Sequence, residues 1–267
     1  MYLKHLFYSV LFLVFTLPLN AQDFEVAPVV MQFKTNSGET ETRVLTIKNH
    51  FSEAQKYSLV LVDYVLDENG EKNTVALGST DRSLVDRVII SPSVIDLLPN
   101  ESKEVTVTMT IPKSDEKTRW GMIQVQVAKE KTMADADREM VTGVIVIPRI
   151  IVIVTQSPAS NKNYAAKVTS LVEKELNDLG FKTFEITIEN TGDKVISGQL
   201  YLALANLETA TEEKFTSIET TVYPGSSKKV ILSLNKTLSK GKYALAALYD
   251  YGHYKAIEGT QILLEIK

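Results

Sequence analysis

The sequence predicts an all-β protein in which two β-sandwiches follow one another along the chain. Three observations support this prediction. Apolar residues alternate with polar ones over short runs, turn-forming residues separate these runs, and the second half faintly repeats the pattern of the first. With 267 residues, the chain is long enough for two domains that each bury a core.

The first 21 residues have the features of a secretory signal peptide. Lys4 and His5 form a basic start, residues 6–17 are almost wholly apolar, and Pro18 is followed closely by the small residue Ala21. This apolar run is shorter than the roughly 20 residues that a membrane-spanning helix needs. We therefore expect cleavage after Ala21 and a periplasmic or extracellular mature protein.

The composition excludes several classes of function. The chain has no cysteine, so it cannot form a disulfide scaffold, a thiol nucleophile, a zinc ribbon or an iron–sulfur cluster. Its 29 Lys and Arg against 33 Asp and Glu give a formal charge of -4. This balance gives no electrostatic reason to expect a nucleic acid as partner.

Groups suited to catalysis or metal binding are scarce. The mature chain keeps only His50 and His253, and neither has a metal-ligand spacing. No phosphate-binding loop, dinucleotide fingerprint or G-x-S-x-G motif occurs. Carboxylates near predicted loops, such as Asp63 and Asp67, leave a glycosidase pair open, although such residues are usually only solvated. We expect a protein that is not an enzyme and uses no metal or cofactor.

The first half contains runs that are typical of half-buried antiparallel strands. Residues 105–111 alternate apolar side chains with threonine, and residues 122–127 alternate them with glutamine. A period of two places one set of side chains in the core and the other in water. The predicted strands are 44–48, 57–62, 105–111 and 122–127, with turns at 36–38, 67–70, 99–100 and 112–115.

The most apolar stretch of the mature chain is residues 144–154. It is β-branched, short and interrupted by Pro148, so a membrane helix is not expected. Because Pro148 cannot donate a hydrogen bond to a neighbouring strand, we expect a sheet edge or a bulge there. Two interpretations stay open: a strand covered on both faces, or an edge that receives a partner.

A polar linker at residues 155–161 separates the two predicted domains. We place the first domain at residues 22–157 and the second at residues 158–267. Residues 174–179 are compatible with one helical turn. The strands predicted for the second domain are 165–172, 181–189, 200–205, 229–234, 243–249 and 261–266.

The two halves share one short pattern. A strand ends on Asn49 in the first half and on Asn190 in the second, and each is followed later by a turn that begins at Pro99 or Pro224 and opens another strand. Two related β-sandwiches in tandem explain this repetition.

The order of segments resembles a known family. Residues 24–33, 90–99 and 118–123 are similar to the opening strand and two later segments of the periplasmic chaperones of pilus assembly, the PapD-like proteins. This resemblance implies two immunoglobulin-like β-sandwiches. Residues 241–243 and 250–252 also resemble the C-terminal sandwich of WxL-interacting surface proteins.

The resemblance implies a way of binding. In PapD-like chaperones, alternate apolar residues of the last strand of the first domain complete a partner subunit's unfinished sandwich by strand addition. An ungapped count back from Pro158 assigns this role to Val144, Val146 and Pro148. The implied partner is a protein subunit of a surface structure.

The family also binds the partner's terminal carboxylate with two basic residues in the cleft between the domains. The same ungapped count places Val30 and Ile153 at those positions, and neither is basic. Arg149 and Lys34 lie nearby in the sequence and are candidates to replace the missing pair. Arg149 also has the simpler interpretation of a strand residue whose guanidinium reaches water.

Two functions follow as expectations. The first is a non-enzymatic periplasmic chaperone or adaptor for exported subunits. The alternative is a surface protein of the WxL-interacting type that holds a cell-wall or host ligand. Among the aromatic residues, we expect Trp120 to anchor a core or sheet edge. The tyrosines near the C-terminus are expected to be core residues or an exposed binding patch, and they are Tyr243, Tyr249, Tyr251 and Tyr254.

Overall fold

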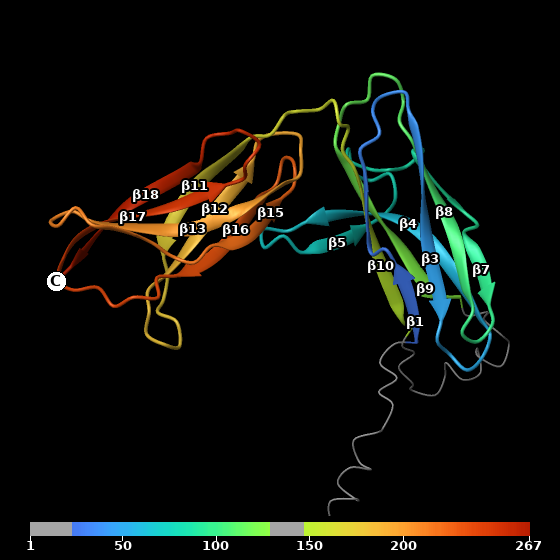
Figure 1. Ribbon diagram of the computed structural model, residues 1–267, viewed down its shortest axis with the longest axis horizontal. Coiled ribbons are helices and arrows are strands. Elements are labelled where there is room, and N and C mark those ends of the chain that lie inside the picture. The colour runs from blue at the N-terminus through green and yellow to red at the C-terminus, as the bar shows by residue number, and fades with distance from the viewer. Residues whose placement is uncertain (1–22, 129–146) are drawn as a thin grey trace, which may run out of the picture.

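A computed structural model describes residues 23–128 and 147–267. The predicted signal peptide and two of the predicted partner-binding residues, Val144 and Val146, lie outside the described residues. Every regular element within the described ranges is a β-strand, and the strands form two separate sandwiches (Figure 1). The predicted all-β fold with two tandem sandwiches is therefore confirmed.

The first sandwich consists of two sheets packed face to face. One has the strand order β1-β3-β8-β6 and the other the order β2-β10-β9-β4-β5, with β7 also paired to β4. The strands are β1 (Phe24–Ala27), β2 (Val30–Phe33), β3 (Thr40–Asn49), β4 (Gln55–Leu66), β5 (Lys72–Val75), β6 (Val88–Ser91), β7 (Val94–Leu97), β8 (Ser102–Thr110), β9 (Arg119–Val127) and β10 (Arg149–Gln156).

The second sandwich has a sheet of order β11-β12-β16 facing a sheet of order β14-β13-β17-β18, with β15 also paired to β13. Its strands are β11 (Ala166–Glu173), β12 (Thr183–Asn190), β13 (Ile196–Asn206), β14 (Glu212–Lys214), β15 (Ile218–Val222), β16 (Ser227–Ser233), β17 (Gly241–Asp250) and β18 (Glu258–Ile266).

The period-two pattern produces the cores as expected. Along β8, Val105, Val107 and Met109 are fully buried, whereas the threonines between them face outward. In the second sandwich, Phe184, Ile186 and Ile188 of β12 alternate in the same way, whereas residues 200–204 of β13 are all buried. Both strands contribute to a core of their own. Each sandwich therefore holds a hydrophobic core, and burial of these side chains is the main favourable contribution to its folding.

Two local expectations were wrong. Residues 174–179 form no helical turn, because Lys174 N–H donates to Thr183 O at 2.8 Å and the Thr183 hydroxyl donates to Glu175 O at 2.6 Å, which ties this segment to β12. The predicted linker also begins too early, since Thr155 and Gln156 still belong to β10.

A buried asparagine explains the repeated pattern in the first sandwich. Asn49 ends β3 and is 0% exposed. Its main-chain N–H donates to Glu101 O at 3.0 Å, and its Nδ2 donates to Leu97 O at 3.2 Å. Its Oδ1 accepts from Phe51 N–H at 3.0 Å and from the Tyr57 hydroxyl at 2.9 Å. One amide thus joins the end of β3 to the turn that precedes β8.

The second sandwich repeats this arrangement at Asn190, which ends β12 and is 1% exposed. Its main-chain N–H donates to Ser226 O at 3.0 Å and its Nδ2 to Val222 O at 2.9 Å. Its Oδ1 accepts from Gly192 N–H at 3.0 Å. Since buried amides need partners for all their polar atoms, the repetition is one structural solution used twice.

We expect Asn49→Ala to lower the free energy of unfolding by about 2–3 kcal/mol, because it leaves buried main-chain carbonyls and the Tyr57 hydroxyl without a partner. Asn190→Ala is expected to act similarly in the second sandwich. Urea denaturation followed by fluorescence and circular dichroism measures the change. Ser52→Ala, an exposed neighbour, is the control and should change stability by less than about 0.5 kcal/mol. Equal losses in the control and the Asn49 variant would contradict this role.

Candidate functional site

Strand β10 has an open edge for part of its length. All of its residues pair with β9, but on its other side β2 pairs only with residues 153–156. The N–H groups of Ile153 and Ser157 donate to Val29 O and Phe33 O, both at 2.9 Å. The N–H and C=O groups of successive residues point to opposite sides of a strand. The N–H and C=O groups of Arg149 and Ile151 therefore point to the same side as those of Ile153, which is the side where β2 lies. No described strand pairs with them there.

The side chains of β10 face two different environments. Val152 and Val154 point into the core of the first sandwich and are 0% exposed. Ile151 and Ile153 are on the opposite face, where they pack against the cluster around Trp120. The outward residues of β10 are therefore odd-numbered, and an apolar face adjoins the open edge.

Two of the predicted partner-binding residues can be placed. Pro148 is half-buried and precedes the first residue of β10, so it removes no hydrogen bond from the described β9–β10 ladder. Arg149 is exposed, and its Nε donates to Gln126 Oε1 at 3.1 Å. It lies four residues, or about 13 Å, from Ile153 along the strand.

An aromatic cluster joins the two sandwiches. The Trp120 ring in β9 lies 5.1 Å from the Tyr223 ring of the second sandwich and 6.5 Å from the Tyr64 ring in β4. The Tyr64 hydroxyl donates to the Tyr223 hydroxyl at 3.1 Å, and Trp120 Nε1 donates to Tyr64 O at 3.3 Å. Burial raises the pKa of both tyrosines. The expectation of an anchoring role for Trp120 is confirmed, but the anchor joins two domains.

A hydrogen-bond network lies beside this cluster. The Asp193 carboxylate accepts from the Arg82 guanidinium, from Thr118 N–H at 3.0 Å and from Asn161 Nδ2 at 2.7 Å. The Arg82 guanidinium also lies over the Trp120 ring, 5.6 Å from its centroid. One carboxylate of the second sandwich thus bonds to two segments of the first and to the linker.

The β4–β5 hairpin makes another contact between the sandwiches. Lys229 N–H in β16 donates to Glu68 O in the hairpin turn at 2.7 Å, and the two side chains form an ion pair. Gly70 has a φ of 82°, and a Cβ there would come within 3.1 Å of the Lys228 side chain. In Figure 1 this hairpin extends from the first sandwich toward the second.

A cleft of about 630 Å³ lies between the sandwiches, at the end of the open edge. Val30 and Ile153 line it and are paired across β2 and β10. The two positions that the ungapped count from Pro158 assigns to a basic pair therefore line the cleft, and both are apolar here. The cleft is basic for another reason, since five lysines line it: Lys34, Lys72, Lys162, Lys194 and Lys228. We call it the lysine cleft.

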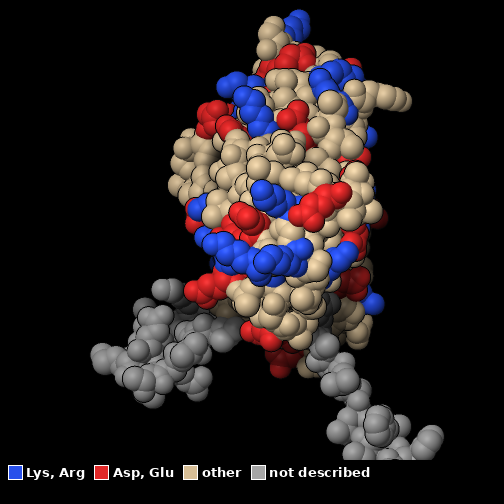
Figure 2. Space-filling view, turned by 90° about the vertical axis from the view of Figure 1, so that its left-hand side faces the viewer, with Lys and Arg blue, Asp and Glu red and all other residues tan. Residues whose placement is uncertain are grey.

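The charge in the lysine cleft is not balanced by ion pairs among the described residues. Its described lining contains no aspartate or glutamate, and none of the five lysines forms an ion pair with a described carboxylate. On the end of the second sandwich seen in Figure 2, by contrast, acidic and basic side chains are interspersed. Lys34, suggested as a replacement for the missing basic pair, lines the cleft, whereas Arg149 does not.

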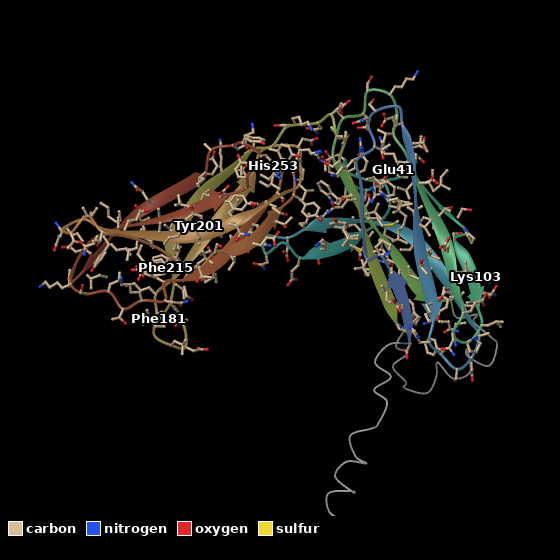
Figure 3. The ribbon with its side chains drawn as sticks, in the orientation of Figure 1. Glu41, Lys103, Phe181, Tyr201, Phe215 and His253 are labelled. Atoms are coloured by element: carbon tan, nitrogen blue, oxygen red, sulfur yellow. The ribbon has the colours of Figure 1, made fainter. Side chains whose placement is uncertain are left out.

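The structure corrects the expectation for one carboxylate and decides between the two expectations for the C-terminal tyrosines. Asp63 is not a solvated loop residue, because it is fully buried in β4 and accepts from the Ser83 hydroxyl at 2.8 Å and from Gly78 N–H at 3.0 Å. The C-terminal tyrosines belong to the second core, apart from the fully exposed Tyr254. His253 stacks on Tyr164 at 3.8 Å, at the end of the second sandwich near the linker (Figure 3).

Within residues 23–128 and 147–267, no helix is long and apolar enough to cross a membrane. The same residues bring together no group of three histidine or carboxylate side chains that could hold a metal ion.

Comparison with known proteins identifies the fold. No family model and no curated protein matches the sequence. A chain from the chaperone–tip adhesin complex of CFA/I fimbriae aligns with 91% of this chain and 98% of its own length, at 13% identity and a TM-score of 0.50. A chain from the CsuC–CsuE chaperone–tip subunit complex of Acinetobacter baumannii aligns with 89% of this chain and 98% of its own length, at 12% identity and a TM-score of 0.46. The fold is PapD-like, with two immunoglobulin-like sandwiches.

We expect Asp193→Asn to loosen the contact between the sandwiches, because it removes the charge from the bond to Arg82. The free energy of unfolding should fall by about 1–3 kcal/mol, and urea unfolding should broaden or separate into two transitions. Asp178→Asn, at an exposed carboxylate in the 174–180 segment, is the matched control and should unfold like the parent protein. A single unchanged transition in the Asp193 variant would show that the network does not couple the sandwiches.

Proposed function

We propose that this chain is a non-enzymatic periplasmic chaperone or adaptor that binds exported surface or fimbrial subunits by β-strand addition. The observation that carries the proposal is the open edge of β10 at Arg149 and Ile151. An extended partner segment can pair with this edge without displacing any described strand.

The chemistry of the edge supports strand addition. Unpaired N–H and C=O groups on an edge strand form a template for another strand, and their hydrogen bonds supply affinity with little dependence on sequence. Ile151 faces the same side as Ile153, so apolar side chains of the partner would find an apolar surface beside the edge. Side-chain pockets on that face would supply selectivity.

The structural comparison supports the class of partner. The structure with a TM-score of 0.50 comes from a complex between a chaperone and a fimbrial tip adhesin. By analogy, the proposed partner here is a protein subunit of a surface structure. We further propose that the binding strand extends from Arg149 back through Pro148 to Val146 and Val144.

The matched pair Ile151→Pro and Ile151→Ala tests strand addition. Both remove the isoleucine side chain, but only proline also removes the N–H at the open edge, and proline is tolerated where that N–H faces away from the sheet. The tagged protein is purified from envelope extract of the source organism, and the co-purified subunit is then co-expressed with each variant. We expect the proline variant to recover at least about tenfold less soluble 1:1 complex than the alanine variant.

Equal recovery with both variants would overturn strand addition at this edge. Retention on cell-wall material without a protein partner would instead favour a surface protein of the WxL-interacting type. Circular dichroism and the urea midpoint of each free variant confirm that the first sandwich is folded before binding is compared.

A second pair of variants tests which side chains of the strand face the partner. The family resemblance assigns the even-numbered Val144, Val146 and Pro148, whereas the outward residues of β10 are odd-numbered. These two assignments agree only if the outward-facing residues change from even-numbered to odd-numbered at Pro148. We expect Val146→Asp to reduce recovery of the complex more than Ile147→Asp. The reverse order would mean that the outward phase of β10 continues toward its N-terminus.

A further inference from the structure

The lysine cleft collects positive charge from distant parts of the chain. Lys34 follows β2, Lys162 lies in the linker, and Lys194 lies between β12 and β13. Lys72 in β5 and Lys228 in β16 come from the two elements that meet at the hairpin contact. Holding five like charges around one cavity is unfavourable unless counter-charge enters it.

Lys194 is the buried member of the set. It is 7% exposed, and its Nζ donates to Pro158 O at 2.8 Å and lies 5.8 Å from the centroid of the Tyr164 ring. An ammonium group has three hydrogen-bond donors, so further donors remain for a ligand. Burial lowers the Lys194 pKa, and the positive charges of Lys162 and Lys34 lower it further, while the Asp193 carboxylate acts in the opposite direction. A bound carboxylate would favour the charged form of Lys194 and so oppose this lowering.

The open edge leads into this cleft. A segment paired along Arg149–Val152 cannot continue past Ile153, because β2 occupies the edge from there onward. Val30, the first residue of β2, and Ile153 both line the cleft, so the segment leaves the edge at the rim of the cleft. The residues that follow it would then lie among the lysines.

We propose that the lysine cleft binds an acidic peptide segment with two or more carboxylates, continuous with the strand that pairs with β10. This inference rests on the proposed strand addition. One carboxylate would neutralise one of five lysines, whereas an acidic segment would reach charges contributed by both sandwiches and by the linker. Each contact would be charge-assisted and partly shielded from water, the setting in which such bonds contribute most.

Blocked synthetic peptides test the proposal on the full mature chain by isothermal titration calorimetry at low salt. The probes are N-acetylated, C-amidated pentaglutamate, the matching pentaglutamine amide, and pentaglutamine with a free terminal carboxylate. We expect the pentaglutamate peptide to bind at least about tenfold more tightly than the single-carboxylate peptide, and the pentaglutamine amide not to bind. Equal affinity for the two charged peptides would overturn the requirement for several carboxylates.

Lys194→Met keeps most of the side-chain length and removes the charge. It should weaken pentaglutamate binding by about tenfold or more, whereas Lys240→Met, at an exposed lysine in the loop before β17, should leave it unchanged. Lys162→Gln, also exposed, is the second test variant, because its substitution disturbs no buried contact. Equal effects of the cleft variants and the Lys240 control would overturn the assignment to this cleft.

Two further measurements separate this inference from related explanations. Tighter binding of tripolyphosphate than of pentaglutamate would identify a phosphate site and overturn the peptide assignment. Ile151→Pro should still bind pentaglutamate, since it alters the edge and none of the lysines. If Ile151→Pro binds pentaglutamate and also recovers as much of the subunit as the parent protein, strand addition at β10 is contradicted. The cleft would still be a binding site for acidic peptides in that case. If pentaglutamate does not bind at all, the inference about the cleft fails and strand addition is unaffected.

Discussion

The contact among Tyr64, Trp120 and Tyr223 determines how the two sandwiches meet, and the cleft between them depends on it. Aromatic side chains bury large apolar areas, so a cluster of three is a strong contribution to an interface. The polar side-chain atoms at its centre are bonded to each other or to main chain, so each of them has at least one hydrogen-bond partner despite its burial. The network at Asp193 adds directional bonds beside this apolar contact. Together they favour one mutual orientation, which keeps the lysines around a common cavity.

The open edge of β10 exists because the first extended segment of the described chain is divided between the two sheets. Residues 24–27 pair with β3 in one sheet, and residues 30–33 pair with β10 in the other. One short segment therefore serves both sheets and covers only half of β10. An uncovered apolar edge would invite self-association, and natural proteins limit this hazard with proline and charged residues at the edge. Pro148 and Arg149 stand where the edge begins. They fit this protective role as well as a role in partner binding.

The sequence predicts local features of this molecule well and its assembled surfaces poorly. Alternation along residues 105–111 identifies a strand and its buried face, because period two is a property of the strand itself. The repeated asparagines are also visible, since each lies at a strand end. By contrast, residues 122–127 alternate apolar residues with glutamine, yet Gln124 is 8% exposed and Met122 is buried. Packing against residues from other strands and from the second sandwich covers the outer face of β9, and no pattern within β9 reports it.

The lysine cleft illustrates the same limit and also indicates why such a site is useful. Its lysines are spread from residue 34 to residue 228, so no local run of basic residues marks them. They converge only when both sandwiches and the linker are in place. Main-chain hydrogen bonds at β10 depend little on the partner's side chains, so this edge alone would bind many extended segments. Charge complementarity at the end of the edge could restrict that choice, because it requires acidic residues at a fixed distance from the paired strand. Because the lysines come from both domains, such recognition would also require the correct domain orientation, which links selectivity to the aromatic contact.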